Sequence, residues 1–175
     1  MDAGALGVMV PNVETPEQAT RARDAMKYLP LGKRGVGLGG AVTGSRKVEP
    51  AEFFERSNAN TTLICQIEST RGLENLDAIA AIDGVDNLWV GHFDLSNSMG
   101  IPAQFQHPDF LAALKRVVET AKKHGKTAGI QPASMEQAEQ WLEIGFNVIS
   151  WNSDYAVYKR ALHAEVGALR ERIGR

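Results

Sequence analysis

The feature that most constrains this chain is a repeated order of a short apolar segment, a polar turn and an amphipathic helix. Segments such as LGVMV and TTLICQI are almost continuously apolar, which is typical of parallel strands covered on both faces of a sheet. Five such units in a row predict an α/β protein with a parallel sheet. The expected strands are residues 5–10, 61–67, 87–91, 127–130 and 147–150.

Helix signals fill the gaps between these strands. Thr15, Pro16 and Gln18 have the residue types of an N-cap, a first helical position and a capping-box partner. Gly125 and Gly145 are typical of residues that end helices. The expected helices are residues 15–28, 50–58, 70–82, 108–124, 134–145 and 154–172. A closed (β/α)8 barrel needs roughly 250 residues, so five units form either an open sheet or part of a barrel.

Composition excludes several classes of protein. The 175 residues include 19 Lys and Arg against 21 Asp and Glu, a net charge near −2, which argues against a nucleic-acid partner and a polybasic membrane surface. There is no apolar run of roughly 18 residues and no basic leader, so the expected location is cytoplasmic. The single cysteine, Cys65, excludes an intrachain disulfide and a cysteine-cluster zinc site, and its apolar neighbours predict a buried thiol.

Residues 35–40 match the pattern G-x-G-x-x-G, which in dinucleotide-binding proteins follows a strand and opens a helix. Neither element is expected here, because PLGKR precedes the pattern while Gly44 and Pro50 follow it. We expect instead a glycine-permissive loop over the strand ends. Arg34, beside this loop, either steers an anionic substrate or is solvated.

A carboxylate ends the strand TTLICQI. Side chains alternate along a strand, so Gln66 and Glu68 are expected to point to one side while Cys65 and Ile67 point to the other. A glutamate at the end of a buried strand needs a partner for its charge, and carboxyl ends are where parallel α/β folds bind ligands. The alternative is that Glu68 caps the helix that starts near Thr70.

The next strand repeats this arrangement, because NLWV is followed by Asp94. Two carboxylates from neighbouring strand ends suit a hard divalent ion such as Mg²⁺, Mn²⁺ or Co²⁺. About four positions of an octahedral ion would remain for water and for a chelating 2-oxo acid. Such an ion stabilises an enolate. A glycosidase-like use of the paired carboxylates is the competing interpretation, but no aromatic sugar platform is evident nearby.

The two motifs resemble one family. QIES and VGHFDLSNSMG look like the QIE(T/S) and GPxDLSxxMG blocks of the HpcH/HpaI aldolases, and MDAGALGVMVPNVETPEQA resembles a further block. The similarity extends over essentially the whole chain. It implies a class II, metal-dependent pyruvate aldolase, commonly hexameric, with a barrel of the phosphoenolpyruvate/pyruvate type. Residues 1–175 would then be a single domain holding the fourth to eighth strands, without the first three βα units.

The resemblance also implies roles for individual residues. Glu68 and Asp94 match the metal ligands, Gln66 matches a glutamine that contacts the oxo acid, and the backbone of Phe93 and Asp94 matches amides that hold the pyruvate carboxylate. Gln131 stands where several relatives have an apolar pocket residue. His92 replaces a proline and is the one candidate for a catalytic side chain, because the family's catalytic histidine and arginine precede the matched region; by strand alternation it would share the side of Asp94, unless it faces the surface.

The implied reaction cleaves or forms 4-hydroxy-2-oxo acids, giving pyruvate and an aldehyde through a metal-stabilised enolate. Two alternatives stay open: a lyase of the citrate-lyase β or malyl-CoA type, for which Arg34, Arg46 and Lys47 are the only basic candidates, and a non-catalytic subunit that binds the metal and the oxo acid. In the family the last helix is exchanged between subunits. The apolar residues of 154–172 and Ile173 fit such an exchange in a homo-oligomer, or packing on the chain's own sheet.

Overall fold

The computed structural model describes residues 1–174, so Arg175, the last residue of the predicted domain, lies outside the described residues. Five parallel strands form one sheet in the order of the sequence. This confirms the predicted α/β class and parallel sheet. The strands are β1 (Gly7–Val10), β2 (Thr62–Ile67), β3 (Asn87–Val90), β4 (Thr127–Ile130) and β5 (Val148–Ile149).

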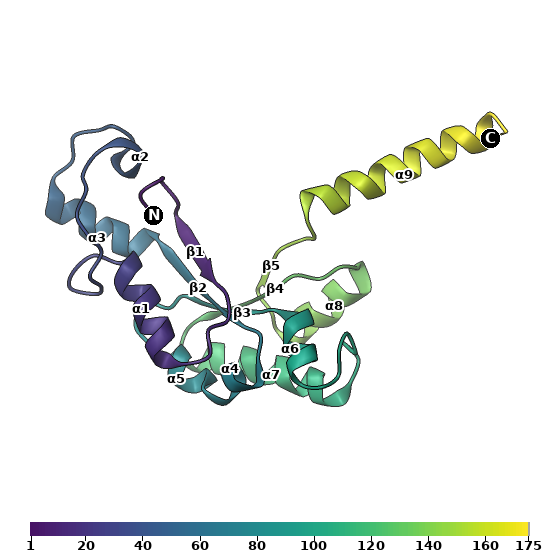
Figure 1. Ribbon diagram of the computed structural model, residues 1–175, viewed down its shortest axis with the longest axis horizontal. Helices are drawn as coiled ribbons and strands as arrows, with labels where there is room; N and C mark the ends of the chain where they lie inside the picture. The colour runs from purple at the N-terminus through teal and green to yellow at the C-terminus, as the bar shows by residue number, and fades with distance from the viewer. Residues whose placement is uncertain (175) are drawn as a thin grey trace.

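The helices connect these strands and lie largely to one side of the sheet (Figure 1). They are α1 (Pro16–Met26), α2 (Gly40–Thr43), α3 (Pro50–Asn60), α4 (Thr70–Glu74), α5 (Leu76–Ala80), α6 (His92–Ser98), α7 (Pro108–Lys123), α8 (Met135–Ile144) and α9 (Asp154–Arg172). Three differences from the sequence analysis matter: the predicted helix 70–82 divides at Asn75, α6 was not predicted, and a single helical turn, α2, begins at Gly40.

The turn α2 corrects the expectation that no helix can start at the end of the glycine pattern. Gly40 adopts a positive φ of 55°, and Gly44 ends the turn in the left-handed region. The dinucleotide interpretation still lacks its first element, because no strand precedes the pattern among the described residues. The pattern therefore lies in a loop, as expected, that contains one short turn.

The predicted helix ends are confirmed at the level of individual hydrogen bonds. The side chain of Thr15 accepts from the backbone N–H of Gln18, and the Gln18 side chain accepts from the backbone of Thr15. Gly145 ends α8 with a φ of 114°, which favours glycine. His107 caps α7 through its Nδ1, which accepts from the N–H of Asp109.

The core lies between the sheet and the helices on its one side. Leu63, Cys65 and Ile67 alternate along β2 and are fully buried in one cluster with the apolar face of α7. The other side chains of β2 are exposed or half-buried, so the expectation of strands covered on both faces is wrong at this strand. Only β3 is buried at all of its residues. Cys65 is a free, buried thiol, as predicted.

At the amino ends of the strands, the side chain of Lys27 is 2% exposed. Its Nζ donates to the carbonyl oxygens of Asn58 and Thr61 and lies 3.7 Å from the Asp86 carboxylate. Asp86 also accepts from the backbone N–H of Leu63. One buried ammonium thus links the end of α1, the end of α3 and the segment that enters β3.

The terminal helix α9 extends away from the sheet (Figure 1) and contains no buried residue. The expectation that it packs on the chain's own sheet is therefore wrong. Its large exposed apolar side chains are Tyr155, Val157, Tyr158, Leu162, Val166 and Leu169, followed by Ile173.

Within residues 1–174, no helix combines the length and the hydropathy that crossing a membrane requires.

Candidate active site

The predicted site residues lie where the strands end. Glu68 directly follows β2, Gly91 directly follows β3, and Gln131 directly follows β4. Because all strands are parallel, these positions share the carboxyl edge of the sheet. Asn12 joins them two residues after the end of β1.

Glu68 is the buried carboxylate of this edge, with 5% of its surface exposed. One oxygen accepts from the backbone N–H of Asn12 at 2.8 Å, and the other accepts from Nε2 of Gln66. The second hydrogen bond confirms that Gln66 and Glu68 point to the same side. Ser69, rather than Glu68, caps α4 by accepting from the N–H of Gly72, so the capping alternative for Glu68 is wrong.

Gly91, which has no side chain, leaves space for the side chains of Glu68 and Gln66. A Cβ atom at Gly91 would lie closer to the Glu68 carboxylate than real Cβ contacts allow, and 2.8 Å from Nε2 of Gln66. The Glu68 carboxylate and the Gln66 amide therefore pack directly against the backbone at the end of β3. This contact joins the ends of two neighbouring strands at the site.

Asp94 lies in the first turn of α6 and is exposed. The first backbone bond of this helix runs from Leu95 N–H to the Gly91 carbonyl, so the N–H groups of Phe93 and Asp94 have no intrahelical acceptor. Gly91 has no side chain to cap them. The turn thus presents two backbone donors and a carboxylate next to Gly91, although no hydrogen bond joins Asp94 to Glu68 within residues 1–174.

His92 begins α6, so the strand alternation that assigned it to the side of Asp94 does not apply. Its ring contacts the rings of Phe93, Phe105 and Trp141, with centroid distances of 4.6, 5.1 and 5.3 Å. Burial lowers the pKa of His92, and the charge of Asp94 opposes that shift. The ring is half-buried in an aromatic cluster, so it is neither fully exposed nor fully enclosed.

The donor set at Glu68 fits a hard cation. No lysine, arginine or histidine forms an ion pair with this buried carboxylate in the described part of the chain, and a buried charge without a counter-charge is costly. The nearby side chains offer oxygen ligands, which Mg²⁺ and Mn²⁺ prefer. No cluster of three or more His, Cys, Asp or Glu is present among residues 1–174, so protein ligands would occupy only part of such an ion's coordination sphere.

Two residues of the site were not singled out by the sequence analysis. Asn12, with a φ of 51°, turns its N–H toward Glu68; the Pro11-Asn12 pair after an apolar strand is a turn signal that could have drawn attention to it. Gly91 follows a strand whose neighbour ends in a carboxylate, but its role depends on the register of β2 and β3, which the sequence does not display.

These features define an α/β protein with a buried, hydrogen-bonded carboxylate at the carboxyl edge of a parallel sheet. A sequence model described as HpcH/HpaI aldolase/citrate lyase matches residues 1–161. The chain belongs to this family, as the motifs in the sequence predicted.

Characterised relatives agree with this assignment. The chain is 35% identical to a 5-keto-4-deoxy-D-glucarate aldolase of Klebsiella pneumoniae, over 98% of this chain and 66% of the relative. It is 37% identical to the protein of the same name in Escherichia coli, over 92% of this chain and 62% of the relative. An HpcH/HpaI aldolase from Desulfitobacterium hafniense has a crystal structure that superposes with a TM-score of 0.88 at 32% identity, covering 96% of this chain and 65% of that one. The chain thus spans less than two thirds of the length of these proteins.

Proposed function

We propose that this chain forms the metal-binding and oxo-acid-binding part of a lyase that cleaves or forms a carbon–carbon bond beside pyruvate. The substrate class is 4-hydroxy-2-oxo acids, which yield pyruvate and an aldehyde. The observation that carries the proposal is the buried Glu68 carboxylate, which has no cationic partner among residues 1–174 and is held by Asn12 and Gln66 at the carboxyl edge. Membership of a family of aldolases and lyases supports the same reaction class.

In this proposal, Glu68 and Asp94 hold a divalent ion such as Mg²⁺, Mn²⁺ or Co²⁺. When bound, the ion supplies a Lewis acid for the keto oxygen of the substrate. Gln66 keeps the Glu68 carboxylate oriented through its Nε2 hydrogen bond. The unpaired N–H groups of Phe93 and Asp94 donate hydrogen bonds to the carboxylate of the oxo acid. Gln131, half-buried after β4, contacts the aldehyde portion.

A proposal about the complete fold follows from the order of the strands. We infer that β1–β5 are five consecutive strands of an eight-stranded barrel, because the order and parallel direction of the sheet are those of one barrel segment. The exposed apolar side chains of α9 support a homo-oligomer in which this helix packs on another copy.

The metal ligands are tested by calorimetric titration of Mn²⁺, with and without pyruvate, into the 175-residue chain. We expect Glu68→Gln and Asp94→Asn each to weaken Mn²⁺ binding by about tenfold or more, since each substitution removes a charged oxygen ligand. Glu139→Gln, at an exposed position of α8, is the matched control and should bind as the unmodified chain does. Unchanged Mn²⁺ affinity in both site variants would refute the ligand assignment.

Catalysis is tested separately from binding. Exchange of the C3 protons of pyruvate with D₂O, followed by NMR, reports removal of a proton from the bound oxo acid. We expect exchange that depends on added Mn²⁺ and disappears in Glu68→Gln. Binding of Mn²⁺ and pyruvate without exchange would show a non-catalytic subunit instead.

A further inference from the structure

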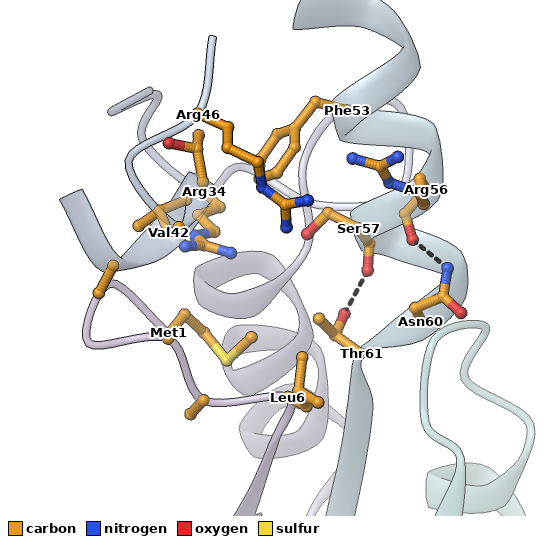
Figure 2. A pocket seen from close by; sticks show the side chains of 15 residues that line it. Met1, Leu6, Arg34, Val42, Arg46, Phe53, Arg56, Ser57, Asn60 and Thr61 are labelled. Carbon is orange, nitrogen blue, oxygen red and sulfur yellow. Dashed lines mark hydrogen bonds between the residues drawn. The ribbon is translucent and has the colours of Figure 1, made fainter. Parts of the chain in front are cut away.

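Figure 2 shows a cavity of about 530 Å³. It lies at the amino ends of β1 and β2, whereas Glu68 follows the carboxyl end of β2. It is formed by the residues that precede β1 and β2, by the loop around α2 and by α3. Its distinguishing side chains are Arg34, Thr43, Arg46, Arg56, Ser57 and Asn60. From the sequence, Arg34 is either a solvated residue or one that attracts an anion.

The charge of this cavity is one-sided. Arg34 precedes α2, Arg46 follows it and Arg56 lies on α3, so three separate segments each contribute a guanidinium (Figure 2). Among the described residues, no aspartate or glutamate lines the cavity. Within residues 1–174, neither Arg46 nor Arg56 forms an ion pair. Three arginine side chains thus line one cavity in a chain whose net charge is near −2.

Two buried donors in the cavity wall lack a partner. The Arg34 side chain is 6% exposed, and it is held by a 2.8 Å ion pair to Asp2 and by the Tyr28 ring, 4.6 Å from its guanidinium carbon. Its Nε nevertheless has no hydrogen-bond partner in the described part of the chain. The same is true of Oγ1 of Thr43, a residue that is 5% exposed. Buried polar groups are normally paired, and these two unpaired donors belong to residues that line the cavity.

We propose that this cavity binds a phosphate group, either as inorganic phosphate or as a phosphate monoester of a small molecule. Phosphate offers several acceptor oxygens, which match the planar forks of guanidinium groups and the free Nε and hydroxyl donors. A single carboxylate has only two oxygens for the three arginines. The cavity and the carboxyl-edge site lie at opposite ends of the strands, so this proposal does not rest on the proposed lyase activity.

The test is calorimetric titration of inorganic phosphate into the 175-residue chain. We expect saturable binding, and we expect Arg46→Gln and Arg56→Gln each to raise the dissociation constant by about tenfold, because each removes one charge-assisted contact. Both side chains are exposed, so these variants should fold. Arg116→Gln, at an exposed position of α7 outside the cavity, is the matched control and should bind phosphate unchanged.

A second measurement follows Arg34 itself. Arg34→Lys keeps the positive charge but removes Nε, so weaker phosphate binding by this variant would support a role for that donor. In the unmodified chain, the ¹H–¹⁵N signal of the Arg34 Nε–H group should shift on addition of phosphate. The proposal is overturned if no saturable phosphate binding occurs, if Arg46→Gln and Arg56→Gln bind like Arg116→Gln, or if chloride at physiological ionic strength abolishes the effect.

The source of the phosphate is distinguished by a competing titration with glycerol phosphate. Tighter binding of the monoester would assign the cavity to a phosphorylated small molecule, whose organic part would occupy the remaining volume. Equal or weaker binding of the monoester would assign it to inorganic phosphate. Both results support a phosphate site.

Discussion

At the scale of the residue, Gly91 leaves no room for a side chain beside Glu68 and Gln66. We expect Gly91→Ala to weaken Mn²⁺ binding and to lower the free energy of unfolding by about 1–3 kcal/mol, the usual cost of overpacking. The reason is that the new methyl group would collide with the Glu68 carboxylate and the Gln66 amide. Urea denaturation and calorimetric Mn²⁺ titration measure the two effects.

Gly37→Ala is the control for this substitution, because, apart from Gly37 and its two chain neighbours, no atom of residues 1–174 lies within 4 Å of a Cβ atom there. It should leave both quantities close to those of the unmodified chain. If Gly91→Ala behaved like Gly37→Ala, the packing of Glu68 and Gln66 against the end of β3 would not matter for the site.

Cys65 makes stability depend on pH in the alkaline range. Burial raises the pKa of this thiol to about 12, with a smaller contribution from the charge of Asp86. The unfolded chain loses the thiol proton near pH 8.5, where the folded chain still holds it, so a rising pH favours unfolding. We expect the free energy of unfolding to fall above about pH 9 more steeply than in Cys65→Ala, as measured by urea denaturation across that range. If the free energy of unfolding depended on pH identically in the two proteins, the raised pKa of Cys65 would be contradicted.

The sequence predicted the orientation of Gln66, Glu68 and Cys65 because strand alternation is a local rule. The same rule failed at His92, since α6 begins there and the strand has already ended. The hydrogen bond from Asn12 to Glu68 joins residues 56 positions apart. Such a contact depends on the neighbouring positions of β1 and β2 in the sheet, which no local pattern contains.

At the scale of the element, the capping box of α1 stabilises a helix that packs on β2. We expect Thr15→Ala to lower the free energy of unfolding by about 1 kcal/mol, because the N–H of Gln18 loses its acceptor. Thr20→Ala, inside the same helix, makes no such change and should stay within about 0.5 kcal/mol. Chemical denaturation of both variants is the measurement, and equal effects would show that the cap contributes nothing.

Helix limits were predictable where a cap residue defines them, as at Thr15, Ser134 and Gly145. They were not predictable where tertiary contacts decide. The amide of Asn75, where the predicted helix 70–82 divides, donates to the carbonyl of Glu14 in the loop after β1. That bond comes from a segment distant in sequence, so the helical pattern of the residues alone could not reveal the break.

At the scale of the whole molecule, α9 carries large apolar side chains that the rest of the described chain leaves exposed. Tyr158, Leu162 and Leu169 are 65%, 48% and 58% exposed. We expect the chain to associate, and Leu162→Glu to reduce the association constant by about tenfold or more, because a charge replaces an apolar contact. Sedimentation velocity over a concentration series measures this.

Ala164→Glu introduces the same charge on the same helix, about 200° around the axis from Leu162. It should leave association unchanged. Equal association in Leu162→Glu and Ala164→Glu would show that the apolar side of α9 does not form the contact between copies.

The buried ammonium of Lys27 lies at the opposite ends of the strands from the Glu68 carboxylate. Its partners Asn58, Thr61 and Asp86 all lie before the strands begin, whereas Glu68, Gly91 and Gln131 come after the strands end. We therefore expect that loops at the carboxyl edge of the sheet can be exchanged without loosening the contacts of Lys27.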